Sequence, residues 1–156
     1  MSKTGVNNLP KDLQPDVLLP KLESYHNDYD EAEARVALKG KTLAIAAKEQ
    51  AAWTLYYKSR KAELDKLCKR LYGRVEATRG VLYKQYTENY SRELSDRAKD
   101  KYIDGDEDFI KINELYLEVR EIYEKISAVV ETFEVRGFAI RDLTTATVHS
   151  IQDGTL

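Results

Sequence analysis

Residues 104–137 read DGDEDFIKINELYLEVREIYEKISAVVETFEVRG, and this stretch decides the fold class. Its apolar residues recur at alternating steps of three and four, the spacing of one continuous stripe along a helix. The stripe consists of Ile112, Leu115, Val119, Ile122, Ile126, Val129 and Phe133. Tyr116, Tyr123 and Val130 widen it on one side. We therefore expect this helix to pack against more than one neighbour.

Both ends of this helix carry recognisable signals. Asp104 is predicted to be the N-cap, because Glu107 follows three residues later and completes a capping-box pattern. Arg136 followed by Gly137 predicts the C-terminus of the helix. The apolar segment 138–148 that comes next is too short to be stable as an isolated helix. We expect it to dock on a partner.

The upstream chain shows the same periodicity less regularly. The first apolar set steps three and four again and consists of Leu22, Tyr25, Tyr29, Ala32 and Val36. The register continues through residues 43–71, where Gln50 and Arg60 also fall on the seam, so we expect looser packing there. Gly73 and Gly80 predict a break or bend, since a glycine inside a helix costs about 1 kcal/mol relative to alanine.

These patterns predict an all-α protein. Only 3 prolines and 7 glycines occur in 156 residues, which is too few turn residues for a β-sandwich. We expect long helices packed as an antiparallel helical hairpin, followed by a short C-terminal oligomerisation helix. Three regions are predicted: an extended flexible arm (residues 1–20) that holds all the prolines, a basic long-helix region (residues 21–100), and a second long helix with the oligomerisation segment (residues 101–156).

Enzyme classes find no support in the sequence. It contains no glycine-rich run that would cradle a phosphate, and neither His26 nor His149 has a cysteine or carboxylate at metal-ligand spacing. Cys68 is the single cysteine and has no partner within the chain for a disulfide. We predict no catalytic residues, no metal and no cofactor. Because no leader pattern and no apolar run of about 20 residues occurs, we expect a cytoplasmic protein that does not enter a membrane.

Charge is unevenly distributed along this chain of net charge −2. Residues 41–90 hold 11 basic and 5 acidic side chains, whereas residues 91–142 hold 9 and 14. The basic segment also contains Trp53 and several tyrosines, and cations with flat rings suit the phosphates and unstacked bases of single-stranded nucleic acid. The candidate binding residues are Lys58, Arg60, Lys61, Lys66, Lys69, Arg70 and Arg74. Two other interpretations stay open: a solvated basic face with packed tyrosines, and a contact with the acidic half of the same chain.

Two short strings resemble a known family. The run Lys101-Tyr102-Ile103-Asp104-Gly105-Asp106-Glu107, the apolar helix after it, and Arg136-Gly137-Phe138-Ala139-Ile140-Arg141 resemble the UvsY recombination mediator family of tailed phages. The resemblance covers residues 101–142 and extends loosely over 21–74, whereas residues 75–100 depart from the family pattern. It implies a non-enzymatic protein that binds single-stranded DNA. It also implies a homo-oligomeric ring of roughly six to eight subunits that helps load a phage recombinase onto DNA coated by single-strand-binding protein.

The resemblance also implies roles for particular residues. Family members contact single-stranded DNA through basic residues just before an aromatic-glycine turn, which matches Lys66, Lys69 and Arg70 here, with Arg74 just after. Subunit association is expected from the C-terminal segment, through Phe138, Ile140, Leu143 and Val148. The alternative is a phage structural or scaffolding protein, which would assemble through its coiled-coil seams without binding DNA.

Overall fold

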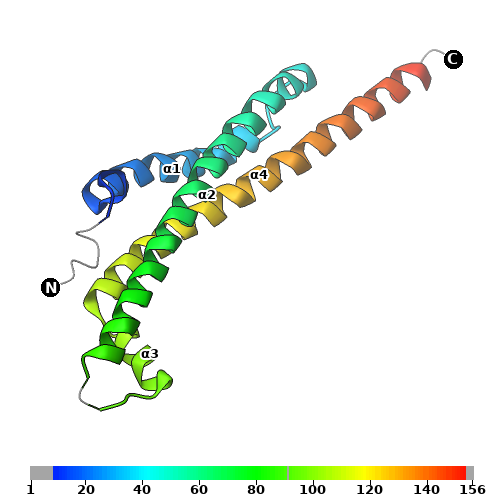
Figure 1. Cartoon of the computed structure of the whole chain (residues 1–156). Helices are drawn as coiled ribbons and strands as arrows, with labels where there is room; N and C mark the ends of the chain where they lie inside the picture. The colour runs from blue at the N-terminus through cyan, green and yellow to red at the C-terminus, as the bar shows by residue number, and fades with distance from the viewer. Residues whose placement is uncertain (1–8, 91, 154–156) are drawn as a thin grey trace. The chain divides into compact units, whose positions relative to one another are not determined.

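A computed structural model describes residues 9–90 and 92–153 of the chain. It contains a short 3-10 helix η2 (Lys11–Leu13) and the helices α1 (Pro15–Val36), α2 (Leu43–Glu88), α3 (Asp96–Asp104) and α4 (Glu107–Asp153) (Figure 1). The prediction of an all-α protein is confirmed. Within the described ranges, each helix falls short of the length and apolar character that crossing a membrane would require.

The chain forms two compact units, and each unit combines segments that lie far apart in the sequence. Of the described residues, unit 1 contains 9–24, 64–90 and 92–123, and unit 2 contains 25–63 and 124–153. Each unit therefore holds a piece of α1, α2 and α4, while α3 belongs to unit 1. The boundaries of these units differ from those of the predicted regions, which followed the order of the sequence. Periodicity shows which face of a helix is apolar, but it does not show which segments share a core.

Unit 1 is built around leucine and β-branched side chains from α1, α2 and α4. Leu18, Leu71 and Val119 are fully buried, one from each helix. The rings of Tyr72 on α2 and Tyr116 on α4 lie 5.6 Å apart, centroid to centroid. In this unit the two long helices thus pack directly on each other.

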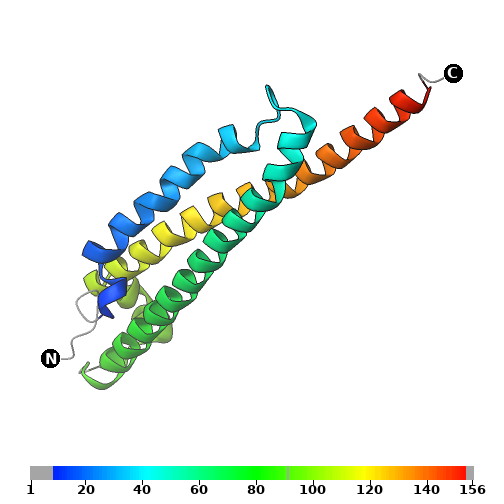
Figure 2. The ribbon, with the colours of Figure 1, turned by 90° about the horizontal axis from the view of Figure 1, so that it is seen from above.

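Unit 2 has an aromatic centre. Tyr57 of α2 stacks on Phe133 of α4, with ring centroids 5.2 Å apart and an interplanar angle of 25°, and both side chains are fully buried. Tyr25 supplies the buried ring of α1. In this unit α1 and α2 contact each other and residues 124–140 of α4, whereas the end of α4 extends beyond them (Figure 2). The predicted stripe on α4 is confirmed through both units, since its seven residues are at most 6% exposed.

The start of α4 differs from the prediction. Asp104 is the last residue of α3 rather than an N-cap, and Gly105 follows as the C-cap of α3. Asp106 takes the predicted capping role, because its Oδ1 accepts the backbone N–H groups of Asp108 at 2.9 Å and Phe109 at 3.2 Å. Two helices separated by a two-residue turn resemble one helix start in sequence, which is why the cap was predicted two residues early.

The predicted end of α4 at Arg136 and Gly137 is wrong, because α4 continues to Asp153. Gly137 has a packing role instead: a Cβ built on it would lie 3.0 Å from Nε2 of Gln50 on α2. The Gln50 side chain uses this space to donate a hydrogen bond to the Phe133 carbonyl at 2.6 Å. Arg136 is 4% exposed and forms hydrogen bonds inside unit 2 rather than marking a helix terminus.

The predicted break near Gly73 and Gly80 is also wrong, since α2 is continuous from Leu43 to Glu88. A Cβ on either glycine would meet nothing within 4 Å, so both lie on an open face. The helical cost of about 1 kcal/mol for each glycine is outweighed by burial of residues such as Leu71 and Leu82. Gly40 lies between α1 and α2 with φ of +79°, a conformation that favours glycine.

The predicted extended arm does not hold for residues 9–20. Residues 11–13 form η2, and α1 begins at Pro15 and contains Pro20 in its second turn. Leu9 and Leu13 are buried, so this segment contributes apolar surface to unit 1. Proline suits the first turn of a helix, and Pro15 is the first residue of α1. The prolines therefore belong to the start of a helix rather than to an extended arm. The rest of the predicted arm, residues 1–8, lies outside the described part of the chain.

Candidate nucleic-acid interface

Four predicted cations lie in unit 1 on the α2 segment and form what we call the α2 cation cluster: Lys66, Lys69, Arg70 and Arg74. The side chains that face the core on this segment are Leu64, Leu67, Leu71 and Val75. Because residues four apart share a helix face, Lys66, Arg70 and Arg74 line up along the outside. Lys66 and Arg74 are exposed, and neither forms an ion pair with any residue that the structure describes.

The other two members of the α2 cation cluster already face carboxylates. Arg70 donates two hydrogen bonds to the Asp12 carboxylate, one of them from Nη2 to Oδ1 at 3.1 Å. Lys69 Nζ lies 2.6 Å from Oδ2 of Asp65. Hydrogen bonding to Arg70 lowers the pKa of Asp12, and hydrogen bonding to Asp65 raises the pKa of Lys69. Both pairs are solvent-exposed and hence weak, so a phosphate group could replace either carboxylate.

The remaining predicted cations belong to unit 2 and are engaged differently. Lys58 Nζ lies 2.9 Å from the Glu134 carboxylate in an exposed pair between α2 and α4. Lys61 is half-buried. Arg60 has a side chain only 18% exposed, and it lies within an internal polar network rather than on an open basic face.

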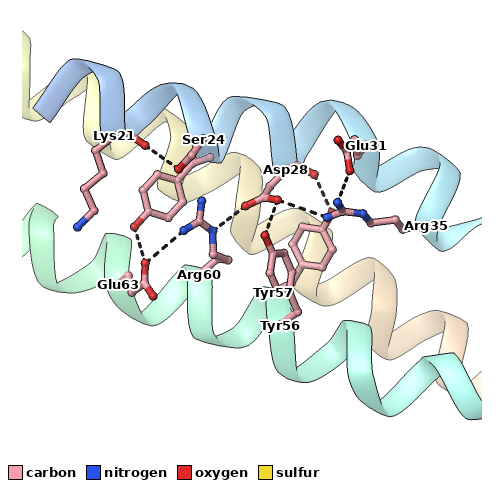
Figure 3. A network of polar contacts seen from close by, with 10 residues as sticks. Lys21, Ser24, Asp28, Glu31, Arg35, Tyr56, Tyr57, Arg60 and Glu63 are labelled. Atoms are coloured by element: carbon pink, nitrogen blue, oxygen red, sulfur yellow. Dashed lines mark hydrogen bonds and ion pairs between the residues drawn. The ribbon is translucent and has the colours of Figure 1, made fainter.

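Asp28 of α1 is the centre of that network (Figure 3). Asp28 is 6% exposed, and its carboxylate accepts hydrogen bonds from the Tyr56 hydroxyl and from Arg60 Nε, both at 2.6 Å. Arg35 Nη1 lies 3.4 Å from the same carboxylate and donates to the Tyr57 hydroxyl at 3.0 Å. A buried carboxylate requires such pairing, because leaving it unpaired away from water is costly.

Tyrosine hydroxyls complete the network. Tyr25 donates to Glu63 at 2.6 Å, while the Arg60 guanidinium lies 3.7 Å from the centroid of the Tyr25 ring. Burial and the Glu63 hydrogen bond raise the pKa of Tyr25, and burial raises the pKa of Tyr56 and Tyr57 as well. A raised pKa in the folded state favours folding below the ordinary ionisation of tyrosine, and that contribution is lost as pH rises through the raised pKa.

The four predicted oligomerisation residues are divided between core and surface. Ile140 is 6% exposed and is the last buried residue of α4 up to residue 151, whereas Phe138, Leu143 and Val148 are 58%, 51% and 48% exposed. Residues 141–151 are all exposed. No other described segment of unit 2 lies beside this end of α4, drawn orange to red (Figure 2). We call residues 141–153 the α4 tail.

The sequence did not single out Asp12, Asp28 or Asp65 as partners of the basic residues, although one signal was present. Gln50 and Arg60 fall on the apolar seam of α2, and polar residues at seam positions indicate buried partners on another helix. The geometry of unit 1 can bind a polyanion: unpaired cations lie at helical spacing beside two cations held by exchangeable carboxylates.

Comparisons with family models, curated proteins and solved structures find no match for this chain.

Proposed function

We propose that this chain is a non-enzymatic recombination mediator. It binds single-stranded DNA as a ring-like homo-oligomer and helps load a phage recombinase onto DNA coated by single-strand-binding protein. The proposal takes its partners from the resemblance of residues 101–142 to the UvsY family. We propose in addition that α2 and α4 form an antiparallel helical hairpin and that the α4 tail is the oligomerisation element.

The observation that carries the proposal is the pair of unpaired cations in the α2 cation cluster. Lys66 and Arg74 are exposed on one face of α2, eight residues apart, with Arg70 between them. Two cations without carboxylate partners attract a polyanion at little desolvation cost, and neutralised phosphates release counterions into solution. When a strand reaches Arg70, one of its phosphates would replace the Asp12 carboxylate as the partner of the guanidinium.

Several copies would strengthen this contact. A strand bound by one subunit meets the cluster of the next at a high effective concentration, so a weak surface becomes a tight one in an assembly. Similar basic clusters around a ring could bend the strand and loosen the protein that coats it. The acidic half of the chain, residues 91–142, offers a surface for the recombinase or for the coat protein.

Removing the unpaired cations should weaken DNA binding. The double variant Lys66→Ala/Arg74→Ala is expected to bind a labelled oligothymidylate at least about tenfold more weakly than the unmodified chain. The slope of log affinity against log salt concentration should fall by roughly 1.4, since each phosphate contact in a single strand contributes about 0.7. Fluorescence anisotropy titrations at several salt concentrations measure both quantities.

The matched control removes two exposed cations from the acidic half of unit 1, as Lys101→Ala/Lys111→Ala. It makes the same change in net charge, and its salt slope should stay at that of the unmodified chain. Equal losses of affinity and slope in both double variants would show that only overall charge matters and would remove the α2 cation cluster from the interface.

The α4 tail should hold the oligomer together. Leu143→Asp/Val148→Asp is expected to reduce the assembly mass, measured by multi-angle light scattering, toward that of a single chain, because charge would enter the exposed apolar face that the tail presents. His149→Asp lies on the side of the helix opposite Ile151, about 100° or more around the helix from Leu143 and Val148, and should leave the mass unchanged. If the double variant keeps the full mass, the tail is not the association element.

The exposed apolar side chains of the α4 tail also suit the alternative, a phage structural or scaffolding protein. Both proposals expect assembly, but only the mediator expects single-stranded DNA binding at moderate salt. Assembly without any binding of oligothymidylate would favour the scaffolding function.

A further inference from the structure

Unit 1 contains a cavity of about 450 Å³ between α2 and α4, beside the end of α3. Small-molecule pockets range from about 300 to 1,000 Å³, so the space suits a flat heterocycle such as a nucleobase. Tyr72 and Arg79 line it from α2, and Phe109, Asn113 and Tyr116 line it from α4. We call it the tyrosine cavity.

Flat groups form its walls. Tyr72 is 51% exposed, and its ring lies 5.6 Å from that of Tyr116 at an interplanar angle of 51°, so the two rings are tilted and Tyr116 does not stack face to face on Tyr72. The Arg79 guanidinium lies 4.7 Å from the centroid of the Phe109 ring. Arg79 is held there by Asp104, 3.0 Å from Nη2. A ring inserted beside Tyr72 would meet aromatic and guanidinium planes, the surfaces on which unpaired bases stack.

Unused hydrogen-bonding groups surround these planes. Asn113 is half-buried, and its side-chain amide forms no hydrogen bond with the described part of the chain. An amide offers a donor and an acceptor, which match the edge of a base. Glu76 and Glu114 also line the cavity and are exposed. Their carboxylates can accept hydrogen bonds from the N–H groups of bases, such as N3–H of thymine or an exocyclic amino group, but would repel a phosphate. The cavity therefore suits the base of a nucleotide and not its phosphate.

We propose that the tyrosine cavity receives an unpaired nucleobase, stacked on Tyr72, from the strand whose phosphates contact the α2 cation cluster. This inference rests on the proposed binding of single-stranded DNA and assigns the selectivity for single strands to a structural element. A base in a duplex is stacked on both faces and paired along one edge, so only an unpaired strand can supply a base to the cavity. Stacking carries no net charge, so this part of the affinity is insensitive to salt.

The test compares Tyr72→Leu with Tyr72→Phe at the same position. Each is titrated with a labelled oligothymidylate and with an abasic oligonucleotide of equal length, at several salt concentrations. Tyr72→Leu should bind oligothymidylate about tenfold more weakly, as expected for the loss of one stacked base, with an unchanged salt slope. Tyr72→Phe keeps the ring and should retain the affinity. The abasic oligonucleotide should bind the unmodified chain and both variants equally.

Three results would overturn the inference. If the unmodified chain binds both oligonucleotides with equal affinity, or if Tyr72→Leu matches Tyr72→Phe on oligothymidylate, the cavity holds no base although DNA binding itself stands. If the unmodified chain binds neither oligonucleotide, the proposed function fails and this inference fails with it. Circular dichroism melting of Tyr72→Leu checks the fold, which should be retained because Tyr72 is half-exposed.

Discussion

Arg136→Met is expected to lower the free energy of unfolding by about 3 kcal/mol. The Arg136 side chain joins three helices within unit 2. Its Nε donates to the Val36 carbonyl at 2.9 Å, and its Nη1 donates to the Ala46 carbonyl at 3.1 Å and to Gln50 Oε1 at 2.6 Å. Methionine would fill much of the same volume, so the loss would come from the acceptors that Arg136 leaves behind.

The Val36 carbonyl makes this arginine costly to remove. Val36 is the last residue of α1, and the final carbonyls of a helix have no donor within it. Arg136 Nη2 has no hydrogen-bond partner among the described residues but lies 3.8 Å from the Glu49 carboxylate, an ion pair that balances the buried charge. Without the guanidinium, the buried carbonyl oxygen of Ala46 and the partly buried oxygens of Val36 and Gln50 lose their donor.

Urea unfolding followed by circular dichroism measures the effect. Arg141→Met is the matched control, because the Arg141 side chain is 68% exposed and its contacts, an ion pair with its neighbour Asp142 and a cation–π contact 5.2 Å from the Phe138 ring centroid, lie at the surface. Its free energy of unfolding should stay within about 0.5 kcal/mol of that of the unmodified chain. Equal stabilities for the two variants would mean that Arg136 adds nothing beyond its alkyl chain.

Asp28→Ala is expected to cost about 3–5 kcal/mol of unfolding free energy, as breaking a buried ion pair does when one partner is removed. The change would leave Arg35 and Arg60 close together without the carboxylate between them. Each of these arginine side chains is only 18% exposed, so water compensates them poorly, and the carboxylates that would remain beside them, Glu31 and Glu63, are exposed and compensate them weakly. The Tyr56 hydroxyl would also lose its acceptor.

A second variant separates lost attraction from stranded charge. Arg35→Met/Arg60→Met in the Asp28→Ala background removes both cations and should recover a large part of the stability, because an apolar replacement of a whole buried network can be neutral. Asp30→Ala, two residues away and exposed, is the control for the helix itself. If the triple variant is no more stable than Asp28→Ala alone, uncompensated arginine charge is not the cause.

The sequence predicts the long apolar helix well, since burial of Ile112 through Phe133 follows directly from their spacing. It predicts the boundaries of helices poorly, and each error has a physical reason. Gly137 resembles a helix stop, but its missing Cβ serves Gln50 of another helix. Gly73 and Gly80 resemble breaks, but the apolar face opposite them keeps α2 intact. A local pattern reports local preferences, and these positions are decided by contacts distant in sequence.

The same distinction applies to the candidate interface. Sequence shows that Lys66, Arg70 and Arg74 share one helix face, and the structure places them there. It does not show that Asp12 would reach Arg70 across 58 residues or that Arg60 would be drawn into a network with Asp28. Nor could it bring Tyr116, from the acidic half of the chain, to the ring of Tyr72. Charge composition finds a basic segment, whereas folding decides which of its cations remain available.

The continuity of α4 changes how the α4 tail would associate. As an isolated peptide, this segment would have to form a helical nucleus, which is the unfavourable step of helix formation. Here the preceding turns are fixed by packed side chains up to Ile140, so the tail only propagates an existing helix. A partner would meet a face that is already ordered, and little further backbone entropy would be lost on contact.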